Sequence, residues 1–117
     1  MRDRLPGRRP SVTATAPWPP GGDNSVHVSP GFDRLGRVKE IFARAARPDT
    51  DLDHAADDAA VMASLALQLG ATLGEIAHSL GRAPGGAPSS LVGFVVDVAL
   101  RLERELLGPA LVGEGSR

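Results

Sequence analysis

The sequence contains no cysteine among its 117 residues, which excludes disulfides, thiolate nucleophiles and cysteine metal sites. A secreted domain of this size usually depends on disulfides, so we expect a reducing compartment, the cytoplasm. Long hydrophobic runs are also missing. The longest, from Ala59 to Leu67, is too short to span a bilayer and contains Ser64. The first residues show no apolar stretch of the kind that a signal peptide requires.

Aromatic residues and excess charge are scarce as well. Trp18 and three phenylalanines are the whole aromatic content, which is too little for a surface on which nucleic-acid bases stack. The formal net charge of −1 argues against a broad basic face for DNA or RNA. We therefore expect neither a nucleic acid nor a membrane as the partner. Hydrophobic residues make up 42% of the chain, enough for one modest core and one domain.

Three strands are predicted in the first half of the chain, near residues 11–16, 25–32 and 37–44, where apolar and polar residues alternate. A loop rich in proline and glycine separates the first two strands. A turn at Asp33-Arg34-Leu35-Gly36 joins the second to the third. Pro30 lacks a backbone donor, so the second strand should lie at an edge or end in a bulge. In the third strand the alternation places Val38 and Phe42 on one face.

Three helices are predicted after Pro48, near residues 51–69, 73–80 and 90–107. Threonines followed three residues later by an acid, at Thr50 and Thr72, have the form of capping boxes. Strands followed by helices predict an α+β fold, a three-stranded antiparallel sheet with three helices packed on one face. The domain should cover residues 11–107, between a flexible basic arm at 1–10 and a flexible tail at 108–117.

The first predicted helix is apolar on nearly every side, which predicts a buried, central position. We expect these residues to be largely buried: Ala59, Met62, Ala63, Ala66, Leu67 and, on the third helix, Phe94. One sheet face and two other helices cannot cover a helix that is apolar all round. The third helix also widens its apolar face with Val92, Val96 and Ala99. A homodimer that buries the surplus surface is therefore expected.

Residues with catalytic chemistry do not form a recognisable set. The three histidines, His27, His54 and His78, lie on different elements without metal-ligand spacing. The aspartates of residues 49–58 surround a helix start, where the helix dipole favours negative charge, and they lack the pattern of a calcium loop. We therefore predict no catalytic, cofactor-binding or metal-binding residue in this chain.

Two stretches resemble the TSCPD domain family. Residues 31–42, Gly-Phe-Asp-Arg-Leu-Gly-Arg-Val-Lys-Glu-Ile-Phe, are similar to the hairpin of that family. Residues 57–80 are similar to its helix pair, in which a Ser-Leu-Ala-Leu run ends at a glycine and a capped helix follows. The residues that carry the resemblance, as structural or interaction residues, are Gly31, Phe32, Asp33, Gly36, Arg37, Glu40, Phe42, Ser64, Leu65, Leu67, Gly70 and Glu75.

The family occurs near the C-terminus of adenosylcobalamin-dependent ribonucleotide reductases and as small stand-alone proteins, and this chain is similar to the stand-alone kind. The resemblance implies a non-catalytic accessory or regulatory module of deoxyribonucleotide metabolism and DNA precursor synthesis, with a ribonucleotide reductase as its protein partner. The radical barrel and the cysteine-containing segment that names the family are absent. We therefore expect the isolated chain to bind no cobalamin and to reduce no ribonucleotide.

Two alternatives remain open. One is a small-ligand or nucleotide sensor, in which the loop at residues 17–24 and the helix starts bind an anion. The other is a reductase subunit that takes part in catalysis, which would require redox thiols or a bound cofactor.

Overall fold

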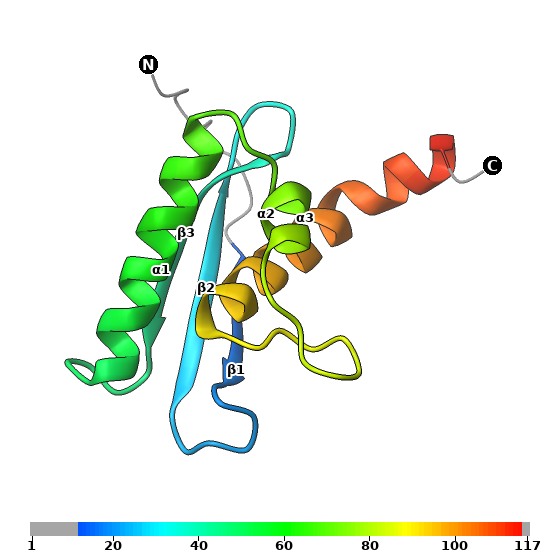
Figure 1. The fold of residues 1–117 in the computed structure, drawn as a ribbon. Helices are drawn as coiled ribbons and strands as arrows, with labels where there is room; N and C mark the ends of the chain where they lie inside the picture. Colours follow the sequence, from blue (N-terminus) through cyan, green and yellow to red (C-terminus); the bar gives the residue numbers. More distant parts are fainter. Residues whose placement is uncertain (1–11, 116–117) are drawn as a thin grey trace.

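The computed structural model describes residues 12–115 of the chain, and the side chains of residues 12–106. Three strands precede three helices (Figure 1): β1 (Ala14–Pro17), β2 (Ser25–Phe32), β3 (Val38–Ala45), α1 (Asp51–Gln68), α2 (Leu73–Ser79) and α3 (Leu91–Gly115). The predicted α+β fold is confirmed. The third helix continues to Gly115 instead of ending near residue 107. The predicted arm at residues 1–10 lies outside the described part of the chain.

The sheet is antiparallel with the order β1-β2-β3, so β2 is the central strand. The expectation that Pro30 marks an edge strand is wrong, whereas the alternative, a bulge at the end of β2, is confirmed beside Gly31. The paired part of β1 ends at Ala14, opposite Val28, so Pro30 lies beyond it. A central strand accommodates this proline because no β1 ladder bond is needed at that point.

The bulge also corrects the prediction that Val38 and Phe42 share a face. Gly31 pairs with Glu40 and Phe32 pairs with Val38, so Lys39 is an additional residue in β3. One extra residue moves every later side chain to the opposite face. Val38 is therefore buried under the helices together with Ile41, whereas Phe42 is 58% exposed on the uncovered face of the sheet.

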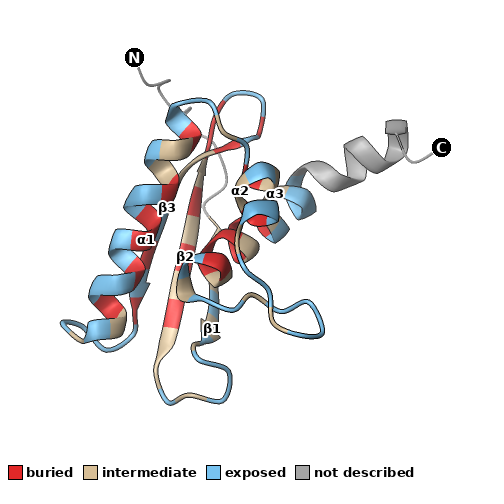
Figure 2. Cartoon of the chain, viewed as in Figure 1, coloured by how far each residue is buried: buried red, intermediate tan, exposed pale blue. Residues whose placement is uncertain are grey.

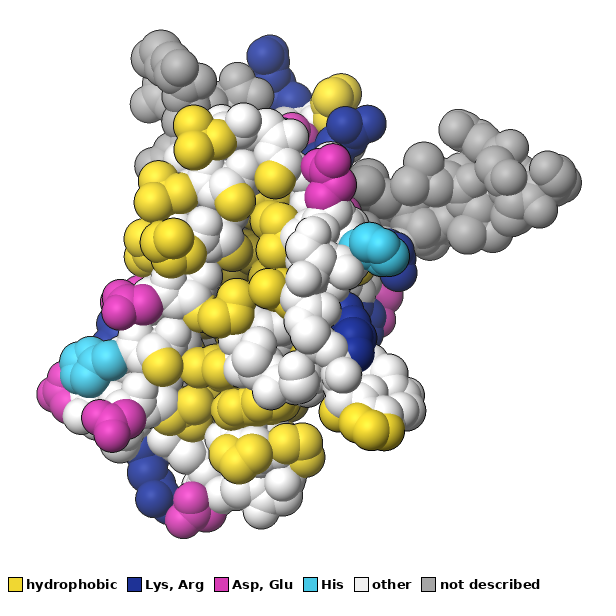
Figure 3. Space-filling view, viewed as in Figure 1, with side chains coloured by type: hydrophobic (Ala, Val, Ile, Leu, Met, Phe, Trp, Pro, Cys, Tyr) yellow, Lys and Arg dark blue, Asp and Glu magenta, His cyan; other side chains and the backbone are white. Residues whose placement is uncertain are grey.

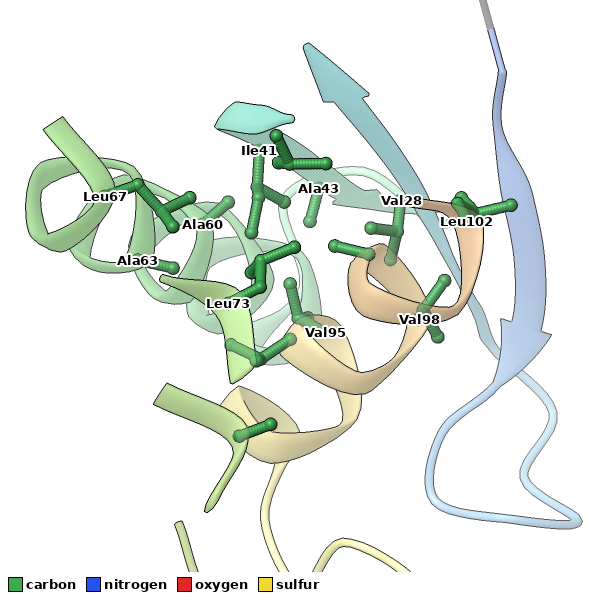
Figure 4. Close-up of a cluster of buried hydrophobic side chains, with 14 of the residues drawn as sticks. Val28, Ile41, Ala43, Ala60, Ala63, Leu67, Leu73, Val95, Val98 and Leu102 are labelled. Atoms are coloured by element: carbon green, nitrogen blue, oxygen red, sulfur yellow. The ribbon is translucent and has the colours of Figure 1, made fainter. Parts of the chain in front are cut away.

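The core lies between the sheet and the helices (Figures 2 and 4). Val26, Val28 and Phe32 of β2 are buried on the covered face, as predicted from their alternation. Val96 and Ala99 of α3 are fully buried, so their predicted place in a self-association surface is wrong. Their burial has a structural reason, because α3 contacts β2, β3, α1 and α2 at once and so needs a wide apolar face.

Two further contacts close the core at its ends. Trp18, in the loop between β1 and β2, stacks on Phe94 with 5.1 Å between the ring centroids. Phe94 is half-buried rather than largely buried as a result of its place at this margin. Arg82 donates to both carboxylate oxygens of Asp97 and so holds the loop after α2 against α3. No helix in the described part of the chain is both long and apolar enough to cross a membrane.

Candidate functional site

Helix α1 lies along the free edge of β3 and satisfies backbone groups of that strand. The Ser64 hydroxyl accepts a hydrogen bond from the Ile41 N–H at 2.8 Å and donates to the Ile41 carbonyl at 3.2 Å. One turn later, the Gln68 amide donates to the Lys39 carbonyl at 3.3 Å. An unpaired strand edge is a template for unwanted pairing with other chains. The helix removes that liability and is itself fixed in position.

Replacing Ser64 with alanine should lower the free energy of unfolding by about 1–3 kcal/mol, because both backbone groups of buried Ile41 would lose their partner. Denaturant unfolding measures this loss. Ser79→Ala is the matched control, since the Ser79 hydroxyl bonds only to the carbonyl of Glu75 within α2 and is exposed. Equal losses in the two variants would contradict this role of Ser64.

The N-terminal end of α1 is held by Asp53, which is 1% exposed. Its carboxylate accepts from the Arg44 guanidinium twice at 2.8 Å, and from the N–H groups of Ala45 and Asp49. These donors, Arg44 foremost, hold the pKa of Asp53 far below its usual range. The predicted capping box at Thr50 is half formed: Thr50 accepts from the Asp53 N–H, but the carboxylate is used by β3 and Asp49 instead.

The opposite side of α1 presents large apolar side chains to solvent. Leu65 and Leu69 follow Val61 at intervals of four residues and so share a face with it, and Met62 lies beside them. Their exposed fractions are 49% for Val61, 65% for Met62, 50% for Leu65 and 87% for Leu69. We call these four residues the α1 patch. Figure 3 shows hydrophobic side chains gathered along α1 and into the depression between α1 and the α2–α3 pair.

The α1 patch corrects the expectation that Met62 is buried. Ala59, Ala63 and Leu67 are buried as predicted, and Ala66 is half-buried. All of them lie on the side of α1 that faces the sheet and the other helices. Nothing among the described residues packs over the opposite side, so the second half of α1, which is apolar on every side, is covered on one side only. An exposed apolar patch of this kind marks an interaction surface.

The structure brings the two family-like stretches together. The hairpin of residues 31–42 lies against the C-terminal half of α1 through the Ile41–Ser64 and Lys39–Gln68 bonds. Most of the residues predicted from the resemblance have structural roles there. Asp33 accepts from the N–H groups of Leu35 and Arg37, and Gly36 has φ of 82°, which the tight turn requires. Phe32 is buried beneath this turn, with Gly31 and Glu40 paired at the bulge.

Most of the predicted residues in the second stretch, residues 57–80, also have structural roles. Leu67 is in the core, Gly70 ends α1 with φ of 115°, and Glu75 completes a capping box with Thr72 as predicted. Leu65 differs from them, because it lies on the exposed side of α1. Leu65 and Phe42 are thus the two apolar members of the predicted set that face solvent. The sequence pattern did not distinguish Val61, Met62 and Leu69 from core residues.

Two charged depressions lie elsewhere on the described part of the chain, and some of the side chains that line them are paired within the fold. One, of about 620 Å³, lies on the outer side of α3 and includes Arg82, Asp97, Arg101 and Glu105. In it Arg82 pairs with Asp97 and Arg101 with Glu105. A second, of about 330 Å³, contains Glu103, whose carboxylate accepts from the Val38 N–H at 2.7 Å. The Arg82–Asp97 and Glu103–Val38 contacts join different elements of the fold, whereas Arg101 and Glu105 are neighbours on one helix, α3.

Metal-ligand geometry is not found in the part of the chain that the structure describes, where no three His, Asp or Glu side chains cluster as ligands would. His27 lies 2.8 Å from the Thr15 hydroxyl, and His54 lies 3.8 Å from Asp49. Among the described residues, the α1 patch is the largest group of exposed large apolar side chains on one element.

Comparison with known proteins found no matching family model, no matching curated protein and no matching solved structure. The resemblance to the TSCPD domain family accordingly remains a prediction from the two sequence stretches.

Proposed function

We propose that this chain is a non-catalytic accessory or regulatory module that acts by binding a protein through the α1 patch. The observation that carries the proposal is the exposure of four large apolar side chains on one helix, in a domain whose core is otherwise closed. Desolvating such side chains is the main favourable contribution to protein association. The rigid attachment of α1 to β3 suits this role, since a preorganised surface loses little conformational entropy on binding.

The setting that we propose is deoxyribonucleotide metabolism in the cytoplasm, with a ribonucleotide reductase as the regulated enzyme. Its support is the resemblance of residues 31–42 and 57–80 to a reductase-associated domain, and the absence of cysteine supports the compartment. In this proposal the reductase supplies the cofactor and the chemistry, and the present chain supplies a docking surface.

Photo-crosslinking in the cells of origin tests the surface. A crosslinking amino acid at Leu65 should give a discrete protein adduct, because this side chain would be enclosed by the partner. The same amino acid at Leu106, an exposed leucine of α3, is the matched control and should not give that adduct. Met62→Glu in the same chain should abolish the Leu65 adduct. Identical adducts from both positions, or none from Leu65, would overturn the proposed docking surface.

A binding titration tests the reductase. The purified reductase of the same organism should bind the chain in calorimetry, and the binding should disappear with Met62→Glu. A reductase that neither binds the chain nor changes its turnover in its presence would remove this enzyme from the proposal.

A further inference from the structure

We propose that the larger charged depression, on the outer side of α3, binds a small organic carboxylate that carries an apolar ring. The inference goes beyond the proposed function, because this depression shares no residue with the α1 patch. Its volume of about 620 Å³ lies within the range of small-molecule sites. Three observations indicate the class of ligand: an apolar part of the lining, two arginines with donors to spare, and the balance of charge.

Apolar side chains make up a large part of the lining. Val98 is buried, and Pro88, Phe94 and Leu100 are half-buried. Phe94 and Val98 are one turn of α3 apart, so their side chains are neighbours on the helix surface. Small-molecule sites combine such an apolar surface with a few polar groups that orient the ligand. A ligand ring is therefore the part that this surface would remove from water.

Two arginines in the lining retain donors for a ligand. Arg101 and Arg104 are one turn apart on α3, and both are exposed. Arg101 lies 3.9 Å from a carboxylate oxygen of Glu105, which is too far for a hydrogen bond. Arg104 makes no hydrogen bond or ion pair with any other residue in the described part of the chain. A guanidinium offers paired N–H donors that match the two oxygens of a carboxylate.

The balance of charge favours a ligand with one negative charge. Three arginines and two acids line the depression, which leaves one positive charge in excess. Arg82 is already committed, since it donates to both carboxylate oxygens of Asp97 and to the backbone carbonyls of Ala77 and Gly86. A monocarboxylate neutralises the excess, whereas a phosphate dianion would place a second negative charge near Glu105.

The only tryptophan of the chain lies next to this site. Trp18 stacks on Phe94, with 5.1 Å between the ring centroids, and Phe94 lines the depression. A ligand ring in contact with Phe94 would therefore change the surroundings of the Trp18 indole. The same contact connects the depression to the loop at residues 17–24, the loop that the small-ligand alternative involves.

An NMR titration of the isotope-labelled chain with naphthoate, a fused-ring carboxylate, tests the site. The amide signals of residues 94–105 and the indole N–H of Trp18 should shift together and saturate, with a dissociation constant of about 1 mM or below. Naphthamide has the same rings without the charge and should bind about tenfold more weakly. Naphthyl phosphate should bind no more tightly than naphthoate, and tighter binding of the phosphate would overturn the assignment of a carboxylate.

Two arginine variants test the role of the charge. Arg104→Gln should weaken the binding of naphthoate by about fivefold and leave that of naphthamide unchanged. Arg37→Gln, at an exposed arginine of the turn between β2 and β3, is the matched control and should change neither. Both side chains are exposed, so both variants should fold, which circular dichroism checks. Equal effects of the two variants, or equal binding of naphthoate and naphthamide, would overturn the inference.

Met62→Glu separates this site from the α1 patch. The variant should leave the signal shifts of residues 94–105 with naphthoate unchanged, because Met62 does not line the depression. Shifts that instead follow α1 and disappear in Met62→Glu would show that the ring binds the α1 patch, and they would overturn the inference. The absence of a saturable shift at residues 94–105 would overturn it as well. Neither result affects the crosslinking test of the protein-docking surface.

Discussion

Leu67→Ala should lower the free energy of unfolding by about 2–5 kcal/mol, the range for a large-to-small change in a packed core. The Leu67 side chain is 1% exposed and belongs to the buried cluster that also contains Ile41 and Leu73 (Figure 4). Its loss leaves a cavity between α1, β3 and the start of α2. Equilibrium unfolding in urea, followed by circular dichroism, measures the difference.

The matched control is Leu69→Ala, two residues further along the chain. Leu69 is 87% exposed, so its truncation should change the stability of the monomer by less than about 0.5 kcal/mol. Both variants should be measured at the same low protein concentration, because Leu69 belongs to the exposed α1 patch. Similar losses of stability in the two variants would contradict the structure, in which Leu67 is buried and Leu69 is exposed.

The order and type of the elements could be predicted from the sequence because local signals agreed with the fold. The alternation of apolar and polar residues predicted the three strands, and Asp33 and Gly36 predicted the turn between β2 and β3. The bulge at Lys39 could not be placed in the same way. A bulge is a feature of two paired strands, and only the pairing of Gly31 with Glu40 reveals which residue is extra. The prediction that Phe42 shares a face with Val38 was wrong for that reason.

The α1 patch could not be predicted from the sequence for a related reason. In the second half of α1, from residue 59 onward, alanine, leucine, valine and methionine occur on every side of the helix, and only Ser64 and Gln68 are polar. A pattern without a polar face does not show which side the sheet covers. In the structure, Ser64 determines which side of α1 faces the sheet. Its hydroxyl pairs with the Ile41 backbone and so fixes the rotation of the helix about its axis. Leu65 and Met62 face away from the core as a consequence.

The structural role of Asp53 could not be predicted from its position in an acidic segment. The sequence places it in an acidic segment with Asp49, Asp51 and Asp57, where each carboxylate has the same apparent role at a helix start. In the structure Asp53 alone of these four is buried, and it joins α1 to β3 through Arg44 and the Ala45 N–H. Strand β3 and the loop before α1 supply the donors, and their convergence on one carboxylate depends on the tertiary fold.

Asp53→Ala should therefore lower the midpoint of thermal unfolding by more than about 10 °C, because the N–H groups of Ala45 and Asp49 and the Arg44 guanidinium lose their acceptor together. Asp51→Ala is the control, since Asp51 is an exposed acid in the same first turn of the helix. It should change the midpoint by only a few degrees. Equal shifts would contradict the central role of Asp53.

The acid dependence of stability isolates the charge of Asp53 from its size. Its donors lower the pKa of Asp53 in the folded protein below the value in the unfolded chain, which is about 4. The stabilisation by the carboxylate is therefore complete above about pH 4 and is lost as the pH falls below it. Asp53→Asn keeps the shape of the side chain but cannot titrate. The wild-type protein should lose stability between about pH 4 and pH 2 more steeply than this variant does, and parallel curves in urea unfolding would show that the charge of Asp53 does not link α1 to β3.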